Sequence, residues 1–162
     1  MKRIFGAAFC MTLALVANAE QKLQVINLAP DKPVSEEAKE RGRKQIAAQE
    51  AAAKITPDEA MAFMARLDAT VNQGHALAKT GGADGKAIRN QAIALNKLDD
   101  EGARFRVLFA PFRSCGNAST DAAMSWQGLV GSDQAQFVEY HEKYIAAAME
   151  CIQTAQSKSS GS

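Results

Sequence analysis

The residues that could bind a metal ion are few. The chain has only two histidines, His75 and His141. Glu139 and Glu142 lie close to His141 in the sequence, so a metal site there would combine an imidazole with a carboxylate. Adjacent residues on a helix point about 100° apart, so His141 and Glu142 do not converge. The chain also lacks the paired histidines of a zinc hydrolase, and we expect no metal site.

Methionine sulfur offers a second route to a metal or to haem. Met61 and Met64 form a Met-x-x-Met pair, and thioethers suit cuprous ion. They flank Phe63 on an apolar stripe, where packing in a hydrophobic core is the simpler role. A methionine and His141 could hold haem without a covalent bond, but the chain has no Cys-x-x-Cys-His motif. We expect no cofactor and keep a metal or haem carrier as an alternative function.

Nucleophiles and acid–base groups give no enzyme signature. No serine lies in a Gly-x-Ser-x-Gly sequence. Asp99, Asp100 and Glu101 could do acid–base chemistry, but such a run on one helix is typical of a solvated surface, or of a contact with a basic partner. The sequence therefore predicts no catalytic residue and a protein that is not an enzyme.

The N-terminus predicts export. Lys2 and Arg3 precede an uncharged run over residues 4–16, which ends at Ala17-Asn18-Ala19, a pattern that signal peptidase cleaves. The run of about 13 residues is shorter than the roughly 20 of a membrane-spanning helix, so residues 1–19 are expected to be a signal peptide and not an anchor. Cys10 would be removed with them.

Cleavage before Glu20 would leave two cysteines, Cys115 and Cys151. An even pair in an exported protein indicates a disulfide bond, and we expect a periplasmic or secreted protein with no stable membrane insertion after cleavage. Cleavage would remove two basic residues and no acidic one, which changes the net charge from +1 to −1. This near balance argues against a nucleic-acid binder, which would carry a basic face.

The rest of the chain predicts an all-α fold. Residues 20–34 contain two prolines and no helical repeat, so they are expected to form an extended arm or linker. Apolar residues then recur in steps of three and four, which predicts a helical domain over 35–156 and a disordered tail over 157–162. The expected helices lie near 35–54, 57–79, 85–109, 112–130 and 134–156.

The first of these helices is Ala-rich and offers few large apolar groups, so it is expected to be loosely packed, either projecting or covering the body. The other four would form an antiparallel bundle. Thr56 and Glu59 form a capping box at the start of the second helix. Gly102 lies within the stripe that runs to Phe109, where it would either admit a close neighbour or weaken the helix by up to about 1 kcal/mol.

The last third predicts a helical hairpin. Its two apolar stripes end at Cys115 and Cys151, and turn residues lie between them at 130–133, with Asp133 as a helix cap. Facing residues of such a hairpin have a constant sum of residue numbers, and the sum set by the two cysteines puts the centre in the turn. The predicted disulfide closes a loop of about 36 residues and would contribute roughly 4 kcal/mol.

The same register gathers aromatic side chains at the turn end of the hairpin. A cluster of this kind is usually part of the core, and its functional alternative is a binding pocket or hot spot. The residues in question are Trp126, Phe137, Tyr140 and Tyr144.

Three classes of function fit these features. The first is an exported, non-enzymatic binding or inhibitory protein whose partner is another protein, such as an immunity protein that neutralises a toxin. The second is a periplasmic stress chaperone or envelope assembly factor, which would suit an exposed helix and an arm. The third is a metal or haem carrier of the helical-bundle type. Small size, a disulfide and the lack of catalytic motifs favour the first class.

Overall fold

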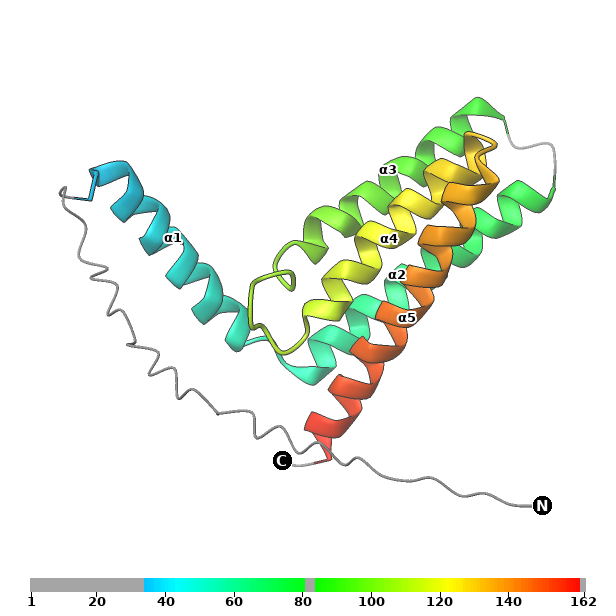
Figure 1. The fold of residues 1–162 in the computed structure, drawn as a ribbon. Coiled ribbons are helices and arrows are strands. Elements are labelled where there is room, and N and C mark those ends of the chain that lie inside the picture. Colours follow the sequence, from blue (N-terminus) through cyan, green and yellow to red (C-terminus); the bar gives the residue numbers. More distant parts are fainter. Residues whose placement is uncertain (1–33, 81–83, 161–162) are drawn as a thin grey trace, which may run out of the picture. The chain divides into compact units, whose positions relative to one another are not determined.

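The computed structural model describes residues 34–80 and 84–160, whose regular secondary structure is entirely α-helical (Figure 1). The expected signal peptide, Cys10 and all but the last residue of the expected arm lie outside the described residues. The fold class predicted from the sequence is confirmed. The helices are α1 (Glu36–Ala53), α2 (Pro57–Lys79), α3 (Gly85–Gly102), α4 (Arg113–Val130) and α5 (Gln134–Ser159).

Side-chain caps explain where α1, α2, α3 and α5 begin. The backbone N–H of Glu59 donates to Thr56 Oγ1 at 3.2 Å, and the Thr56 N–H donates to Glu59 Oε2 at 2.8 Å. The predicted capping box of α2 is therefore present. Asp133 accepts a hydrogen bond from the Gln136 N–H and caps α5, as predicted. These bonds satisfy N–H groups that would otherwise lack a partner at the helix start.

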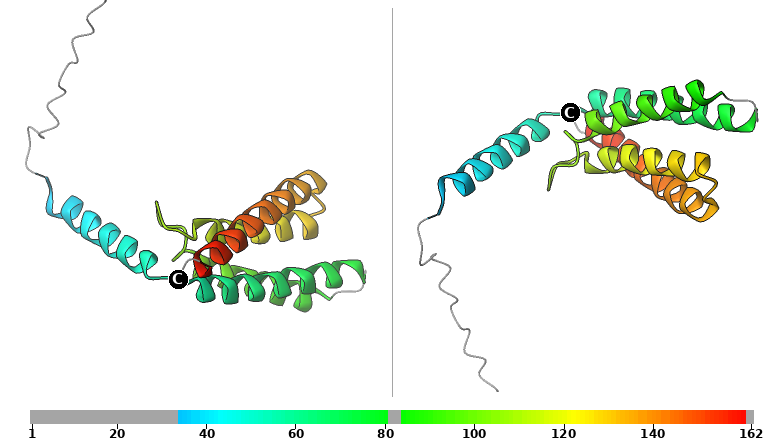
Figure 2. Two further views of the ribbon diagram at one scale, coloured as in Figure 1. Left: turned by 90° about the horizontal axis from the view of Figure 1, so that it is seen from below. Right: turned by 90° about the horizontal axis from the view of Figure 1, so that it is seen from above.

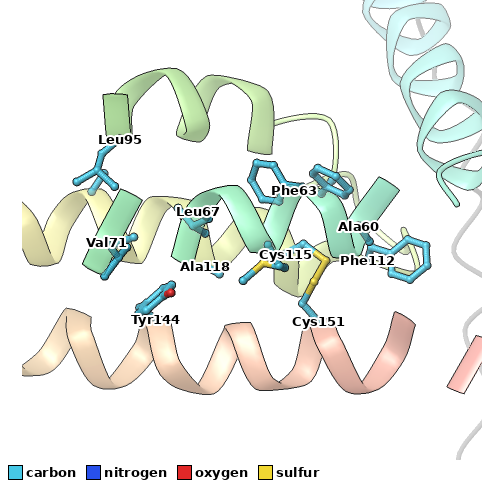
Figure 3. Close-up of a cluster of buried hydrophobic side chains, with 14 of the residues drawn as sticks. Ala60, Phe63, Leu67, Val71, Leu95, Phe112, Cys115, Ala118, Tyr144 and Cys151 are labelled. Carbon is cyan, nitrogen blue, oxygen red and sulfur yellow. A yellow bond between two sulfur atoms is a disulfide. The ribbon is translucent and has the colours of Figure 1, made fainter. Parts of the chain in front are cut away.

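The helices α2 to α5 form a bundle of two hairpins, α2–α3 and α4–α5, whose axes cross at an angle (Figure 2). Helices α2 and α4 each contact the other three helices of the bundle. Helices α3 and α5 do not contact each other and flank the α2–α4 pair on opposite sides. All four helices contribute side chains to the core, and so do Phe105 and Phe112 of the α3–α4 connection (Figure 3).

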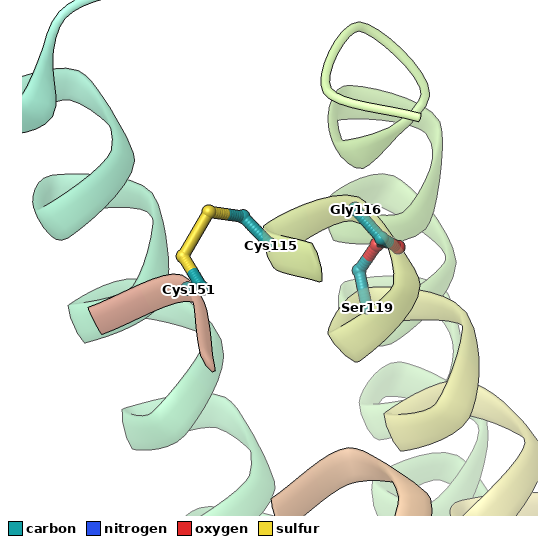
Figure 4. Close-up of a disulfide and its surroundings, with 4 residues drawn as sticks. All are labelled: Cys115, Gly116, Ser119 and Cys151. Atoms are coloured by element: carbon teal, nitrogen blue, oxygen red, sulfur yellow. Dashed lines mark hydrogen bonds between the residues drawn. A yellow bond between two sulfur atoms is a disulfide. The ribbon is translucent and has the colours of Figure 1, made fainter. Parts of the chain in front are cut away.

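The disulfide joins Cys115, near the start of α4, to Cys151 of α5, with their Cα atoms 4.9 Å apart (Figure 4). Both cysteines are fully buried in the core. The predicted pairing is confirmed. At the other end of the hairpin, a Cβ on Gly128 would lie 2.5 Å from the backbone nitrogen of Phe137, so the two helices touch there through backbone. This contact lies within one residue of the predicted register.

The prediction that the third helix reaches residue 109 is wrong, because α3 ends at Gly102. A Cβ on Gly116 of α4 would come within 2.5 Å of the Gly102 carbonyl oxygen, so the two backbones cross at a pair of glycines. Beyond this crossing the chain turns, and Phe105 packs its ring 4.8 Å from that of Phe63. The close-approach interpretation of Gly102 is therefore the correct one.

The ends of the domain differ slightly from the prediction. Helix α5 continues through Ser159, so the expected tail is helical over its first three residues, and residues 161–162 lie outside the described residues. Helix α1 packs along none of the other helices and buries only Ala52. Ion pairs along its own surface, such as Lys39 with Glu36 and Lys44 with Glu40, are typical of a solvated helix.

Candidate functional site

The connection between α3 and α4, residues 103–112, is named here the Phe109 loop. Two of its phenylalanines, Phe105 and Phe112, are buried in the core with exposures of 0% and 1%. They act as anchors on either side of the tip. A loop held at both ends by buried aromatic rings presents its tip in one orientation.

A polar network also holds the loop. Arg106 forms an ion pair with Asp99 of α3 and a hydrogen bond to Thr120 of α4. Thr120 in turn donates to Asp99 at 2.8 Å, and Ser119 donates to the Gly116 carbonyl oxygen at 2.8 Å (Figure 4). Burial alone would raise the pKa of Asp99, but hydrogen bonds from Arg106 and Thr120 outweigh it and lower that pKa. Asp99 is thus a structural carboxylate, and the acidic run at 99–101 is not simply a solvated surface.

The tip of the loop is apolar and faces solvent. Phe109 is 87% exposed, and the neighbouring Leu108 is 46% exposed. The backbone of Phe109 has φ 64°, a left-handed conformation that is costly for a bulky side chain. A phenylalanine here therefore gains no burial and strains the backbone, so its presence is not explained by stability.

A cavity of about 350 Å³ lies beside the loop, at the end of α1. Its wall is mostly apolar, and Val107 extends this wall toward the tip of the loop. The lining residues are Ala48, Ala51, Ala52, Lys54, Ile55, Glu59, Ala103, Arg104 and Val107. This volume suits one or two apolar side chains of a partner.

Charges of both signs surround the loop. Arg104 is 45% exposed and forms ion pairs with Glu59 at 3.5 Å and with Glu101 at 3.7 Å. Arg113 is exposed at the first position of α4, where no side chain caps the helix and no acidic residue lies in the first turn. A cation at a helix N-terminus is unfavourable, because it faces the positive end of the dipole. The start of α4, at the end of the loop, is therefore the part of these surroundings that favours an anionic group.

The four aromatic residues predicted to cluster are only partly brought together. The imidazole of His141 stacks between Phe137 and Tyr144, with ring centres 5.4 and 6.1 Å away. Trp126 instead faces α2 and α3, because it lines a small cavity with residues of both helices and touches Gly74. Tyr140 is half-buried beneath the ammonium group of Lys143.

The aromatic group contains both histidines, which the sequence analysis did not pair. His75 of α2 and His141 of α5 have ring centres 5.0 Å apart. Nδ1 of His141 is buried without a hydrogen-bond partner among the described residues. Burial, together with the charges of His141 and Lys79, lowers the pKa of His75.

The methionine pair lies in a different groove, of about 200 Å³, between α2 and α5. Met64 is buried in the core, and Met61 packs against it. Tyr144 donates a hydrogen bond to Asp68 in the same groove, at 3.1 Å, and burial followed by the charge of Asp68 raises the pKa of Tyr144. No histidine lines this groove, so His141 and the methionines do not form a common haem or copper site.

No family model matches the chain, and no curated protein or solved structure is significantly similar to it. Within residues 34–80 and 84–160, every helix is too short or too polar to cross a bilayer. The same residues contain no group of three or more histidines, cysteines and carboxylates that could enclose a metal ion.

Proposed function

We propose that this chain is an exported, non-enzymatic protein that binds another protein through the Phe109 loop. The observation that carries the proposal is the exposed side chain of Phe109 on a strained backbone. A large aromatic side chain on a rigid, exposed loop is a typical binding hot spot. Strain at such a position is retained when binding benefits from it.

The surface around Phe109 indicates the chemistry of the partner. The apolar tip formed by Leu108 and Phe109 needs an apolar pocket on the partner. The exposed Arg113 at the uncapped start of α4 favours an acidic group at the rim of that pocket. The cavity beside Val107 can receive a side chain of the partner. An exposed aromatic side chain that fills a pocket on the partner is suited to inhibition, and neutralisation of a toxin is the specific form that we propose.

Two features support the exported location that this function needs. The N-terminal sequence has the charge, length and small-residue pattern of a cleaved signal peptide. The disulfide between Cys115 and Cys151 is stable in an oxidising compartment, such as the bacterial periplasm, and is rare in a reducing one. Cell fractionation and N-terminal sequencing test this part, with a mature chain that begins at Glu20 as the expected result.

Partner binding is tested with variants that keep the fold. In Phe109→Asn the ring is removed, but asparagine tolerates the left-handed backbone. Ile93→Gln is the matched control, because Ile93 is an exposed apolar residue on α3, away from the loop. A partner captured from periplasmic extract by the full chain is purified, and its affinity for each variant is measured by calorimetry.

We expect Phe109→Asn to weaken binding by about 30-fold or more, the effect of losing a hot spot worth about 2 kcal/mol. Ile93→Gln should change the affinity less than twofold. If the partner binds Phe109→Asn as tightly as the wild-type chain, the loop is not the binding surface. If the wild-type chain captures no stoichiometric partner, the protein-binding function is wrong.

A further inference from the structure

The two histidines of the chain meet although 65 residues separate them in the sequence. His75 lies on α2 and His141 on α5, and the packing of these helices brings their rings to a centre distance of 5.0 Å with an interplanar angle of 68°. The ring of Phe137 packs against both imidazoles. It stacks on His141 at an angle of 12° and meets the edge of His75 at 6.0 Å.

This spacing matches that of two imidazoles bound to one metal ion. Metal–nitrogen bonds of about 2.0–2.1 Å in a tetrahedral site place two ring centres about 5 Å apart. The two side chains thus already have nearly the separation that an ion would require.

The hydrogen bonding of His141 also favours a metal ligand at this ring. Its Nδ1 is buried and has no partner among the described residues. A neutral imidazole has one nitrogen that donates and one that accepts, so an unpaired buried nitrogen leaves one of these functions unused. A metal ion at this nitrogen would use its lone pair.

We propose that His75 and His141 bind one divalent transition-metal ion of the Zn²⁺ or Cu²⁺ class. Imidazole is a preferred ligand of these ions. The two histidines leave further coordination positions open to water or to a donor from another molecule, as in a site that takes up and passes on an ion. The site is separate from the Phe109 loop, because His75 lies about 18 Å further along α2 than Phe63, on which the loop packs.

The single tryptophan of the chain provides the readout. Trp126 lines a small cavity together with His75. A paramagnetic Cu²⁺ ion bound to His75 and His141 should therefore quench the fluorescence of Trp126. The full chain, purified without a histidine tag, is titrated with CuCl₂. Binding of ZnCl₂ is followed by its competition with Cu²⁺. We expect saturable quenching at one ion per chain, reversal by a chelator, and no competition from MgCl₂, because Mg²⁺ prefers oxygen ligands.

The variants His75→Phe and His141→Phe keep an aromatic ring in the cluster but remove the nitrogen ligands. Each should weaken Cu²⁺ binding at least about tenfold. Glu142→Gln, next to His141 on α5, should leave it unchanged, because residues next to each other on a helix point apart. Thermal unfolding followed by circular dichroism verifies that each variant is folded.

The proposal is overturned if the wild-type chain shows no saturable quenching, or if the folded histidine variants bind Cu²⁺ as tightly as the wild type. Phe109→Asn should bind the metal normally. Failure of the metal site therefore leaves the protein-binding function untouched, and failure of that function leaves the metal site untouched.

Discussion

Gly102 lies so close to Ser119 that a Cβ atom at position 102 would overlap the serine hydroxyl and lie 3.1 Å from its Cβ. Ser119 is fully buried, and its hydroxyl donates to the Gly116 carbonyl oxygen. It cannot turn away without losing this hydrogen bond. The end of α3 can therefore approach α4 only because residue 102 has no side chain.

We predict that Gly102→Ala lowers the free energy of unfolding by about 1–3 kcal/mol, because it overpacks the α3–α4 contact. The control is Gly85→Ala in the same helix, where a Cβ meets nothing within 4 Å. That change should be neutral or stabilise by up to about 1 kcal/mol. Urea unfolding measures both. A smaller penalty for Gly102→Ala in a Ser119→Ala background would identify the hydroxyl as the obstacle, and an equal penalty would contradict this explanation.

Removal of the disulfide should loosen the α4–α5 hairpin. The double variant Cys115→Ser, Cys151→Ser is expected to lose about 4 kcal/mol of stability, since it frees a loop of 36 residues in the unfolded chain. Hydrogen exchange should increase first near the start of α4 and in the last third of α5. The wild-type chain under reducing conditions serves as the comparison. Unchanged thermal stability after reduction would show that the bond does not support the fold.

Acid should weaken the anchor of the Phe109 loop through Asp99. The folded protein lowers the pKa of Asp99 below its ordinary value of 3.8, so the stabilisation is complete above that value. As the pH falls below about 4, the unfolded chain takes up the proton first and stability decreases, until Asp99 is also protonated in the folded state. Asp99→Asn should lack this part of the pH dependence.

The same variant should also be less stable at pH 7, by about 1–2 kcal/mol, because Arg106 and Thr120 lose a charged acceptor. Urea unfolding of both proteins between pH 2.5 and 7 provides the measurement. Parallel curves for the wild type and Asp99→Asn would exclude this carboxylate as a source of the acid sensitivity.

Within the Phe109 loop, the exposed Phe109 should contribute little to the stability of the fold, whereas the buried Phe112 should contribute much. Phe109→Gly relieves a left-handed backbone and removes an exposed side chain, so we expect the free energy of unfolding to stay the same or rise slightly. Phe112→Ala empties a buried position and should cost about 3–5 kcal/mol. Thermal melts compare the two. A large loss of stability in Phe109→Gly would show that the tip has a structural role after all.

Much of the fold is encoded locally and was predictable. The capping box at Thr56, the cap at Asp133 and the pairing of Cys115 with Cys151 follow from residues within one helix end or one hairpin. The end of α3 was mispredicted because Phe105 and Phe109 continue a helical spacing. Phe105 is buried by Phe63 of another helix, and spacing alone does not distinguish that contact from one made within a helix.

Two relations at the candidate sites are contained in no local pattern. The register of the hairpin gives the position of Trp126 along α4 but not the direction in which its side chain points. The side chain lies toward α2 and α3, which α4 contacts in addition to α5. The approach of His75 to His141 requires the packing of α2 on α5. The run Val107-Leu108-Phe109 before a proline was a visible signal for an exposed apolar loop, but it was absorbed into the predicted helix.

The burial of Phe105 and Phe112 on either side of an exposed tip has a consequence for how this protein can change. Residues 107–110 can be exchanged while both anchors remain, so the tip can acquire a new specificity without a new fold. Antibodies use a rigid framework and replaceable loops in the same way. A library randomised at these four positions would be a practical source of binders to other targets.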